Sequence, residues 1–352
     1  MNPSGETVSD RADAIELTIE RPAVGGRMIA RWEGRVVLVA GAIPGEQVRA
    51  AVEGTRGGAI LARTLDVMRP SPDRRPVAVP ASCGGRSLAH VAYPRQLALK
   101  SEIVRDAFRR IGRIDLPESP AVAASPETGY RMRARLHAGD GGVGFLDEGS
   151  HRVCGAAGTG VLSAGAERVV AVLNERAGDL LAGGVRTVEL AEDLAGERCV
   201  LHMPVEGPVA AAGVPWEALA EQAGVTGLSV ASVALPGPPL AVGSPFVTDP
   251  LAAFLPSPRA ETLALRRHAN AFFQANRHLV AGLTAAAAEL AGGGDVVDLY
   301  AGVGLFAASI AARGGARVTA VERDRVSAAD LAANPPPPEG QLAVLPGPGE
   351  RA

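Results

Sequence analysis

The segment that most constrains the fold of this sequence spans residues 295–306. An apolar run there ends in an acidic residue and a G-x-G turn, which opens directly into an alanine-rich stretch. Twenty residues after Gly302, a second apolar run ends in Glu322. The pattern predicts the first two strands of a parallel α/β nucleotide-binding sheet. Glycines let a ligand approach the backbone closely, and a carboxylate at the end of the second strand can accept hydrogen bonds from ribose hydroxyls.

The position of this segment in the sequence creates a second expectation. Only thirty residues follow Glu322, whereas an open parallel sheet needs several more strand–helix units. Residues 341–352 have the pattern of a third strand and its turn, cut off as it begins. We therefore expect an incomplete, C-terminally truncated domain.

The length and composition of the sequence limit the number of domains and the class of protein. A chain of 352 residues with 47% hydrophobic and 21% charged residues is expected to form two to three domains. Residues 1–13 are polar and lack the apolar core of a signal peptide, and no uninterrupted apolar stretch reaches membrane-spanning length. We expect a disordered N-terminus and a soluble, monomeric, cytoplasmic protein that does not enter a membrane. The net charge of −3 argues against binding polyanions over the whole surface, although local patches can differ.

Residues 14–70 predict a small β-barrel. Five short apolar segments at residues 15–19, 28–32, 36–39, 48–52 and 59–67 are separated by glycine and proline turns. Over residues 15–75, ten arginines stand against seven acidic residues, which suits an RNA backbone but also an ordinary solvated surface. The runs G-G-R-M-I-A-R and E-G-R-V-V-L-V-A-G-A-I-P-G-E-Q-V within residues 19–48 resemble a TRAM domain, an OB-like RNA-binding module.

The middle of the sequence predicts a β-rich central domain formed by residues 71–94 and 121–256. Residues 95–120 interrupt it with an amphipathic helix, which we expect to pack on the C-terminal domain of residues 257–352. One central strand alternates strictly and places three arginines on one face, where they could follow phosphates or simply form an exposed antiparallel face. These arginines are Arg131, Arg133 and Arg135.

A cysteine motif opens the central domain. The sequence C-G-G-R-S-L-A-H from Cys83, with the later Y-R-M-R-A-R-L-H, resembles the iron–sulfur region of the RNA 5-methyluridine methyltransferases. In that family four cysteines hold the cluster, but here Val77, Arg86 and Thr159 stand where the other three would be. Because a cluster needs several thiolates, we expect no iron–sulfur cluster and no metal site.

The box F-F-Q-A-N at residues 272–276 lies one helix before the D-L-Y-A-G-V-G turn. This order resembles the S-adenosylmethionine site of the RNA uracil-C5 methyltransferases, and the resemblance runs through the chain. It implies that Gln274, Tyr300 and Glu322 contact the cofactor and that Gly302 and Gly304 shape its pocket. The expected fold is multidomain: an OB-like barrel, a β-rich central domain and an incomplete Rossmann-like α/β domain that binds S-adenosylmethionine.

The resemblance implies an S-adenosylmethionine-dependent methyltransferase of tRNA or rRNA. The family attacks carbon 6 of uracil with a cysteine and later removes a proton with a base, both downstream of the second strand. No cysteine follows Cys199, so we predict no catalytic residues and no methyl transfer by these 352 residues. One alternative is a catalytically inactive RNA-binding relative. A remote one is an NAD-dependent oxidoreductase, because the turn also satisfies G-x-G-x-x-A.

Overall fold

The computed structural model describes residues 14–77, 83–156, 158–334 and 342–346. The expected disorder of residues 1–13 therefore lies outside the described residues. The chain forms two compact units, Met1–Ala124 with Asp147–Ser150, and Ser125–Leu146 with His151–Ala352. Residues 71–77 and 83–94 belong to the first unit in this grouping. The domain bounds expected from the sequence stay a prediction.

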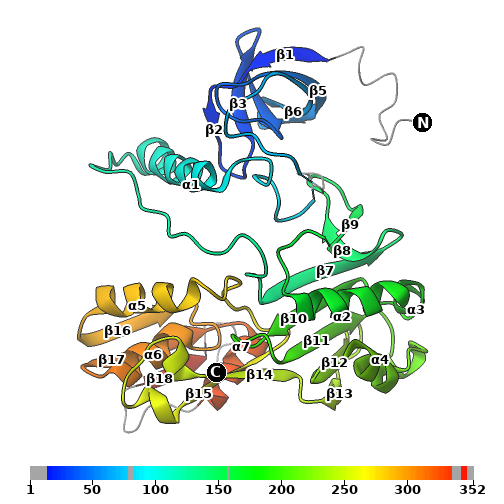
Figure 1. The fold of residues 1–352 in the computed structure, drawn as a ribbon. Coiled ribbons are helices and arrows are strands. Elements are labelled where there is room, and N and C mark those ends of the chain that lie inside the picture. The colour runs from blue at the N-terminus through cyan, green and yellow to red at the C-terminus, as the bar shows by residue number, and fades with distance from the viewer. Residues whose placement is uncertain (1–13, 78–82, 157, 335–341, 347–352) are drawn as a thin grey trace. The chain divides into compact units, whose positions relative to one another are not determined.

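The first unit contains a six-stranded sheet in the order β1-β5-β6-β4-β3-β2, which curls around its own core (Figure 1). All five expected strands are present, and the short β2 is additional. Glu33 and Gly34 join β3 to β4, and their φ values of 48° and 76° fit the two-residue hairpin turn that matches strand twist. The strands are β1 (Ile15–Thr18), β2 (Arg21–Pro22), β3 (Met28–Trp32), β4 (Arg35–Ala40), β5 (Gln47–Arg56) and β6 (Ala59–Arg69).

One long helix belongs to the same unit. Helix α1 (Tyr93–Ala107) continues into a π-helical turn, η2 (Phe108–Gly112), and Arg113 ends it in a left-handed conformation with φ 56°. Pro94 lies in the first turn, where its missing N–H is not needed. Leu99 is the buried residue of α1 and joins the core of the curled sheet. The packing of this helix on the C-terminal domain stays a prediction.

The second unit begins with a seven-stranded sheet in the order β13-β12-β11-β10-β7-β8-β9. The expected hairpin is confirmed, because β7 and β8 pair antiparallel across the Gly139–Gly142 turn. The strands are β7 (Arg133–Gly139), β8 (Gly142–Leu146), β9 (Val153–Gly155), β10 (Thr187–Glu192), β11 (Cys199–Val205), β12 (Gly227–Ser232) and β13 (Leu240–Gly243). The helices are α2 (Ala164–Glu175), α3 (Ala177–Ala182), η3 (Val209–Ala211) and α4 (Trp216–Ala223).

The arginines at the start of this sheet have a structural role. Met132 and Ala134 are buried, as the alternation predicted. On the other face, Arg133 donates to Glu189 at 3.0 Å, and Arg135 donates to the same carboxylate. Glu189 is itself buried. The two guanidinium groups are therefore partly neutralised within the sheet, which weakens the idea that this face follows phosphates.

The C-terminal part carries a three-stranded parallel sheet in the order β16-β17-β18 (Figure 1). The third strand expected in residues 341–352 is present as β18, parallel to β17. The sheet strands are β16 (Gly294–Leu299), β17 (Ala316–Glu322) and β18 (Leu342–Pro346), and an antiparallel pair, β14 (Phe246–Pro250) and β15 (Ala264–His268), precedes them. The helices are η4 (Leu251–Ala253), η5 (Ala260–Thr262), α5 (Val280–Ala291), α6 (Leu305–Arg313) and α7 (Arg325–Ala333).

Candidate functional site

The turn between β16 and α6 has an unusual backbone. Tyr300, Gly302 and Gly304 have φ values of 61°, 58° and 94°, so three of five consecutive residues occupy the left-handed region. Tyr300 is not a glycine, and a non-glycine residue there is strained, which is a common property of ligand sites. Its side chain is 88% exposed, so no packing of the ring explains the conformation.

Glycine is required at the last of these positions for a second reason. A Cβ atom on Gly304 would lie 2.6 Å from Cδ1 of Leu331 in α7. The turn therefore lies close against α7, and α6 begins directly after it at Leu305. The amides of the turn and of the first turn of α6 accordingly collect at the carboxyl end of β16, where open parallel sheets bind ligands.

Glu322, at the carboxyl end of β17, reaches this turn. Leu299 of β16 lies opposite Val321 in the parallel register, which brings the ends of the two strands together. One Glu322 oxygen accepts the amide of Gly302 at 2.7 Å, and the other accepts the amides of Arg323 at 2.7 Å and Asp324 at 2.6 Å. The carboxylate is 8% exposed. The structure thus brings together the two residues that the sequence spacing paired.

Asp298 fixes the helix that follows the turn. Its side chain accepts the amide of Ala307, in the first turn of α6, at 3.1 Å. Burial raises the pKa of Asp298, the hydrogen bond from Ala307 opposes this effect, and the nearby Glu322 charge adds to it. Two carboxyl groups therefore lie at the strand ends, in a region where the backbone supplies amide donors.

The F-F-Q-A-N segment lies beside the turn. The carbonyl oxygen of Phe272 is 3.9 Å from the position that a Cβ of Gly302 would occupy. Phe273 is buried, and Ala275 accepts a hydrogen bond from the amide of Met132 at 2.8 Å, which anchors the segment. Gln274 lies between them and is half-buried. The backbone carrying Gln274 is therefore close to the turn.

Asn334 supports the site and was missed in the sequence. Its amide group donates to the carbonyl of Val303 at 2.9 Å and also exchanges hydrogen bonds with the backbone of Arg266. The side chain thereby joins the glycine turn to β15. An asparagine directly after a helix ordinarily indicates only a helix end, so no local signal revealed this role.

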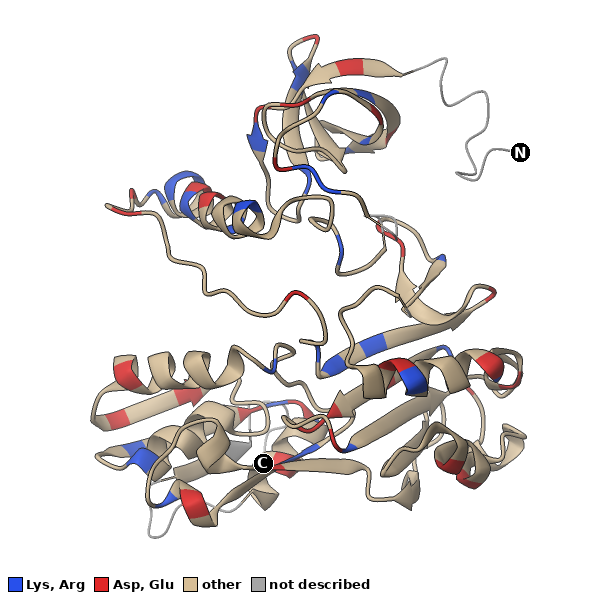
Figure 2. Cartoon of the chain, viewed as in Figure 1, with Lys and Arg blue, Asp and Glu red and all other residues tan. Residues whose placement is uncertain are grey.

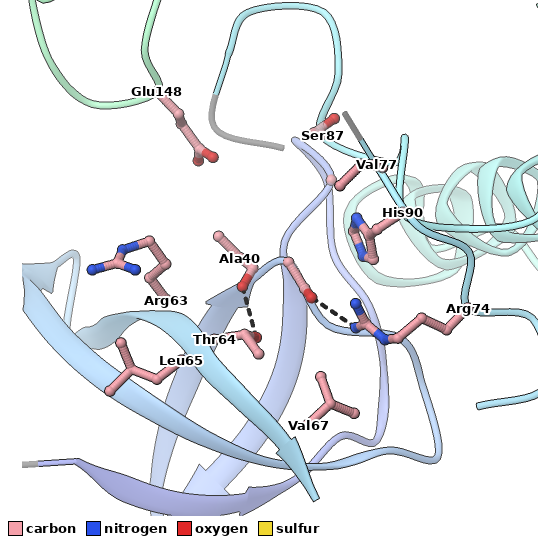
Figure 3. Close-up of a pocket in the computed structure, with 12 residues that line it drawn as sticks. Ala40, Arg63, Thr64, Leu65, Val67, Arg74, Val77, Ser87, His90 and Glu148 are labelled. Atoms are coloured by element: carbon pink, nitrogen blue, oxygen red, sulfur yellow. Dashed lines mark hydrogen bonds between the residues drawn. The ribbon is translucent and has the colours of Figure 1, made fainter. Parts of the chain in front are cut away.

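The curled sheet of the first unit has a cavity of about 300 Å³ (Figure 3). Arg63, Arg74, His90 and Glu148 are among the residues that line it. His90 donates from Nε2 to the carbonyl of Ala42 at 2.9 Å, and burial lowers the pKa of His90, so the ring is neutral. The histidine is neutral, Arg74 is paired with Glu46, and Arg63 is paired with Glu53 at 3.6 Å. Little unpaired positive charge is therefore left to bind a phosphate here.

Two further properties concern metals and membranes. Within residues 14–77, 83–156, 158–334 and 342–346, no group of three or more His, Cys, Asp or Glu side chains is arranged to hold a metal ion. No helix in the same ranges is long and apolar enough to span a bilayer.

Comparisons with known proteins first give the class. The fold is similar to that of the tRNA (uracil-54, C5)-methyltransferase of Pyrococcus abyssi, solved in complex with S-adenosyl-L-homocysteine. The TM-score is 0.69 at 20% identity, covering 94% of this chain and 79% of that protein. This chain therefore shares the fold of that protein. No protein-family model matches the chain.

Proteins that are similar in sequence indicate a more specific class of protein than the fold does. The chain is 43% identical over 122 residues to the 23S rRNA (uracil(1939)-C(5))-methyltransferase RlmD of Pseudomonas entomophila, covering 34% of this chain and 27% of that protein. It is 37% identical over 150 residues to RlmD of Methylococcus capsulatus, covering 40% and 34%. The chain is therefore a relative of the RNA uracil-C5 methyltransferases, as the motifs indicated. The matches span about a third or less of these relatives' length.

Proposed function

We propose that the chain is the cofactor-binding part of an S-adenosylmethionine-dependent RNA (uracil-C5) methyltransferase that acts on rRNA or tRNA in the cytoplasm. The observation that carries this proposal is the Glu322 carboxylate, held 2.7 Å from the amide of Gly302 at the carboxyl ends of two parallel strands. The Pyrococcus abyssi protein of similar fold, described with S-adenosyl-L-homocysteine, supports it.

Each residue of the site has a proposed role. The carboxylate of Glu322 accepts ribose hydroxyls, and Gly302 and Gly304 leave room for the ligand beside the backbone. Tyr300 is exposed at the strand end, where its ring can cover the adenine, and Gln274 orients the bound molecules from the neighbouring segment. When bound, S-adenosylmethionine supplies an electrophilic methyl group.

We also propose that the curled sheet of residues 14–70 is a TRAM domain that binds RNA. Support comes from its six-stranded topology and from the excess of arginine over acidic residues in residues 15–75. The central domain then supports the C-terminal domain of residues 257–352, which carries the proposed cofactor site. We expect the protein to be a monomer without an iron–sulfur cluster.

These 352 residues are proposed to bind the cofactor without transferring its methyl group. Attack on carbon 6 of uracil needs a thiolate in the site. Cys199 lies in β11, and burial raises the pKa of its thiol, with the charges of Glu192 and Asp193 adding to the effect. It therefore stays protonated and cannot be the nucleophile. Cys83 and Cys154 are disulfide-bonded, so neither offers a thiolate. Formation of 5-methyluridine by the purified chain from labelled cofactor would contradict this part.

Isothermal titration calorimetry tests the cofactor site. S-adenosyl-L-homocysteine is expected to bind the full chain, and Glu322→Gln should weaken binding about tenfold or more, because hydrogen bonds to a charged acceptor are lost. Glu289→Gln removes an exposed acid from α5 and is the matched control. Binding of NAD instead, or equal affinities for both variants, would refute the assignment.

A further inference from the structure

A cluster of arginines surrounds one acid at the end of α1. The carboxylate of Asp106 forms ion pairs with the guanidinium groups of Arg21 at 3.3 Å, Arg109 at 3.0 Å and Arg110 at 2.8 Å. Burial acts to raise the pKa of Asp106, but the three guanidinium groups outweigh it and lower the pKa below its usual value. One negative charge thus faces three positive ones, and the Asp106 cluster has a net charge of about +2.

The arginines of the cluster remain accessible. The side chains of Arg21, Arg109 and Arg110 are 41%, 62% and 51% exposed, whereas that of Asp106 is only 15% exposed. The acid lies beneath, and the guanidinium groups form the surface above it. Because Asp106 already orders these long side chains, less rotamer entropy remains to be lost when a ligand binds.

The cluster spans two elements of the first unit. Arg21 belongs to β2 of the curled sheet, and Arg109 and Arg110 belong to the π-helical turn η2. The basic residues gather along α1 and continue past its end (Figure 2). Between residues 95 and 113, six basic side chains stand against two acidic ones. A charge spread over two elements suits a chain of phosphates better than a single anion.

Apolar side chains lie beside these charges. Ile111 is 77% exposed and Phe108 is 42% exposed, and both come from the π-helical turn. Cations interleaved with an aromatic and an aliphatic side chain are typical of single-stranded nucleic-acid sites, where bases stack on apolar groups and arginines hold the backbone.

We propose that the Asp106 cluster with Phe108 and Ile111 is a binding surface for single-stranded RNA. The inference rests on the RNA-methyltransferase function proposed above and names a second place where the substrate is held. The guanidinium groups of Arg21, Arg109 and Arg110 contact successive phosphates, and the apolar side chains of η2 contact unpaired bases.

Fluorescence anisotropy with a labelled, unstructured single-stranded RNA and the full chain tests the proposal over a series of NaCl concentrations. The variant R109Q/R110Q removes two phosphate contacts. The plot of log K against log salt has a negative slope, and the magnitude of this slope should decrease by about 1.4. At 0.1 M salt this change corresponds to roughly 25-fold weaker binding. The variant R176Q/R186Q is the control, since it removes two partly exposed arginines from the second unit. It should leave the slope unchanged.

A second variant separates the apolar contact from the charges. Ile111→Ser should weaken RNA binding without changing the salt slope, because no phosphate contact is lost. Equal slopes for wild type and R109Q/R110Q would overturn the inference while leaving RNA binding, and so the proposed function, intact. A second outcome would also overturn it. In that case the wild-type chain binds vesicles of phosphatidylcholine and phosphatidylglycerol but not RNA, and R109Q/R110Q weakens the vesicle binding. Unchanged S-adenosyl-L-homocysteine binding by each variant shows that the cofactor site is unaffected.

Discussion

Replacement of Gly304 by alanine should destabilise the second unit for two separable reasons. The first is conformational: φ is 94°, and an L-residue in the left-handed region costs roughly 1–2 kcal/mol, partly offset because alanine loses less entropy on folding. The second is steric: the new Cβ would lie 2.6 Å from Cδ1 of Leu331, and overpacking costs about 1–3 kcal/mol. The expected total is roughly 2–4 kcal/mol.

Gly315→Ala is the matched control for the conformational part. Gly315 has φ 83°, but a Cβ there meets nothing within 4 Å, so this variant should lose only about 1 kcal/mol. The difference between the two variants measures the contact with Leu331. In a double-mutant cycle, Leu331→Ala should remove that contact and give a coupling energy of about 1 kcal/mol or more.

Urea unfolding followed by tryptophan fluorescence supplies the measurement. The chain has two tryptophans, Trp32 in the first unit and Trp216, which is buried in the second. In a Trp32→Phe background, the signal reports the second unit alone. If Gly304→Ala were no more destabilising than Gly315→Ala, the close approach of the turn to α7 would be refuted.

Two other predictions concern buried polar groups. Arg267→Met should destabilise the second unit by roughly 3–5 kcal/mol in urea unfolding, because Asp249 then loses its partner in a buried pair. An unchanged midpoint would contradict this. Burial, with the neighbouring His268, lowers the pKa of His202 to about 4. The unfolded chain therefore binds the proton first, and stability should fall as the pH drops from about 6.5 towards 4, by roughly 2–3 kcal/mol at pH 4.5. The His202→Asn variant should lose most of this pH dependence. Equal pH profiles of stability for the wild type and this variant would show that His202 is not the source of the dependence.

The local pattern of the sequence was enough to predict the glycine turn and its partner. Gly302 and Glu322 are brought together because strand, turn, helix and strand follow one another without interruption, and parallel register then fixes the distance between strand ends. The same logic predicted the curled sheet, where turn glycines mark each strand boundary.

Contacts between distant segments could not be predicted in this way. Asn334 supports the carbonyl of Val303 from thirty-one residues away, and nothing near it in the sequence indicates a partner. Arg133 and Arg135 suggested a phosphate-binding face, but Glu189, on a strand more than fifty residues later, neutralises part of their charge. Both cases depend on which segments the fold places side by side.

If Glu322 binds the ribose as proposed, its existing hydrogen bonds limit the way in which the ribose is held. A carboxylate offers about four lone-pair sites, and the amides of Gly302, Arg323 and Asp324 already use three of them. One site remains, whereas a ribose brings two hydroxyl donors. In the proposed cofactor site, a nucleoside that enters would therefore share or displace an amide hydrogen bond. Gly302 belongs to the turn, so binding of the sugar would be coupled to a change in the backbone conformation of the turn. A nucleoside that lacks one hydroxyl would leave the turn as it stands.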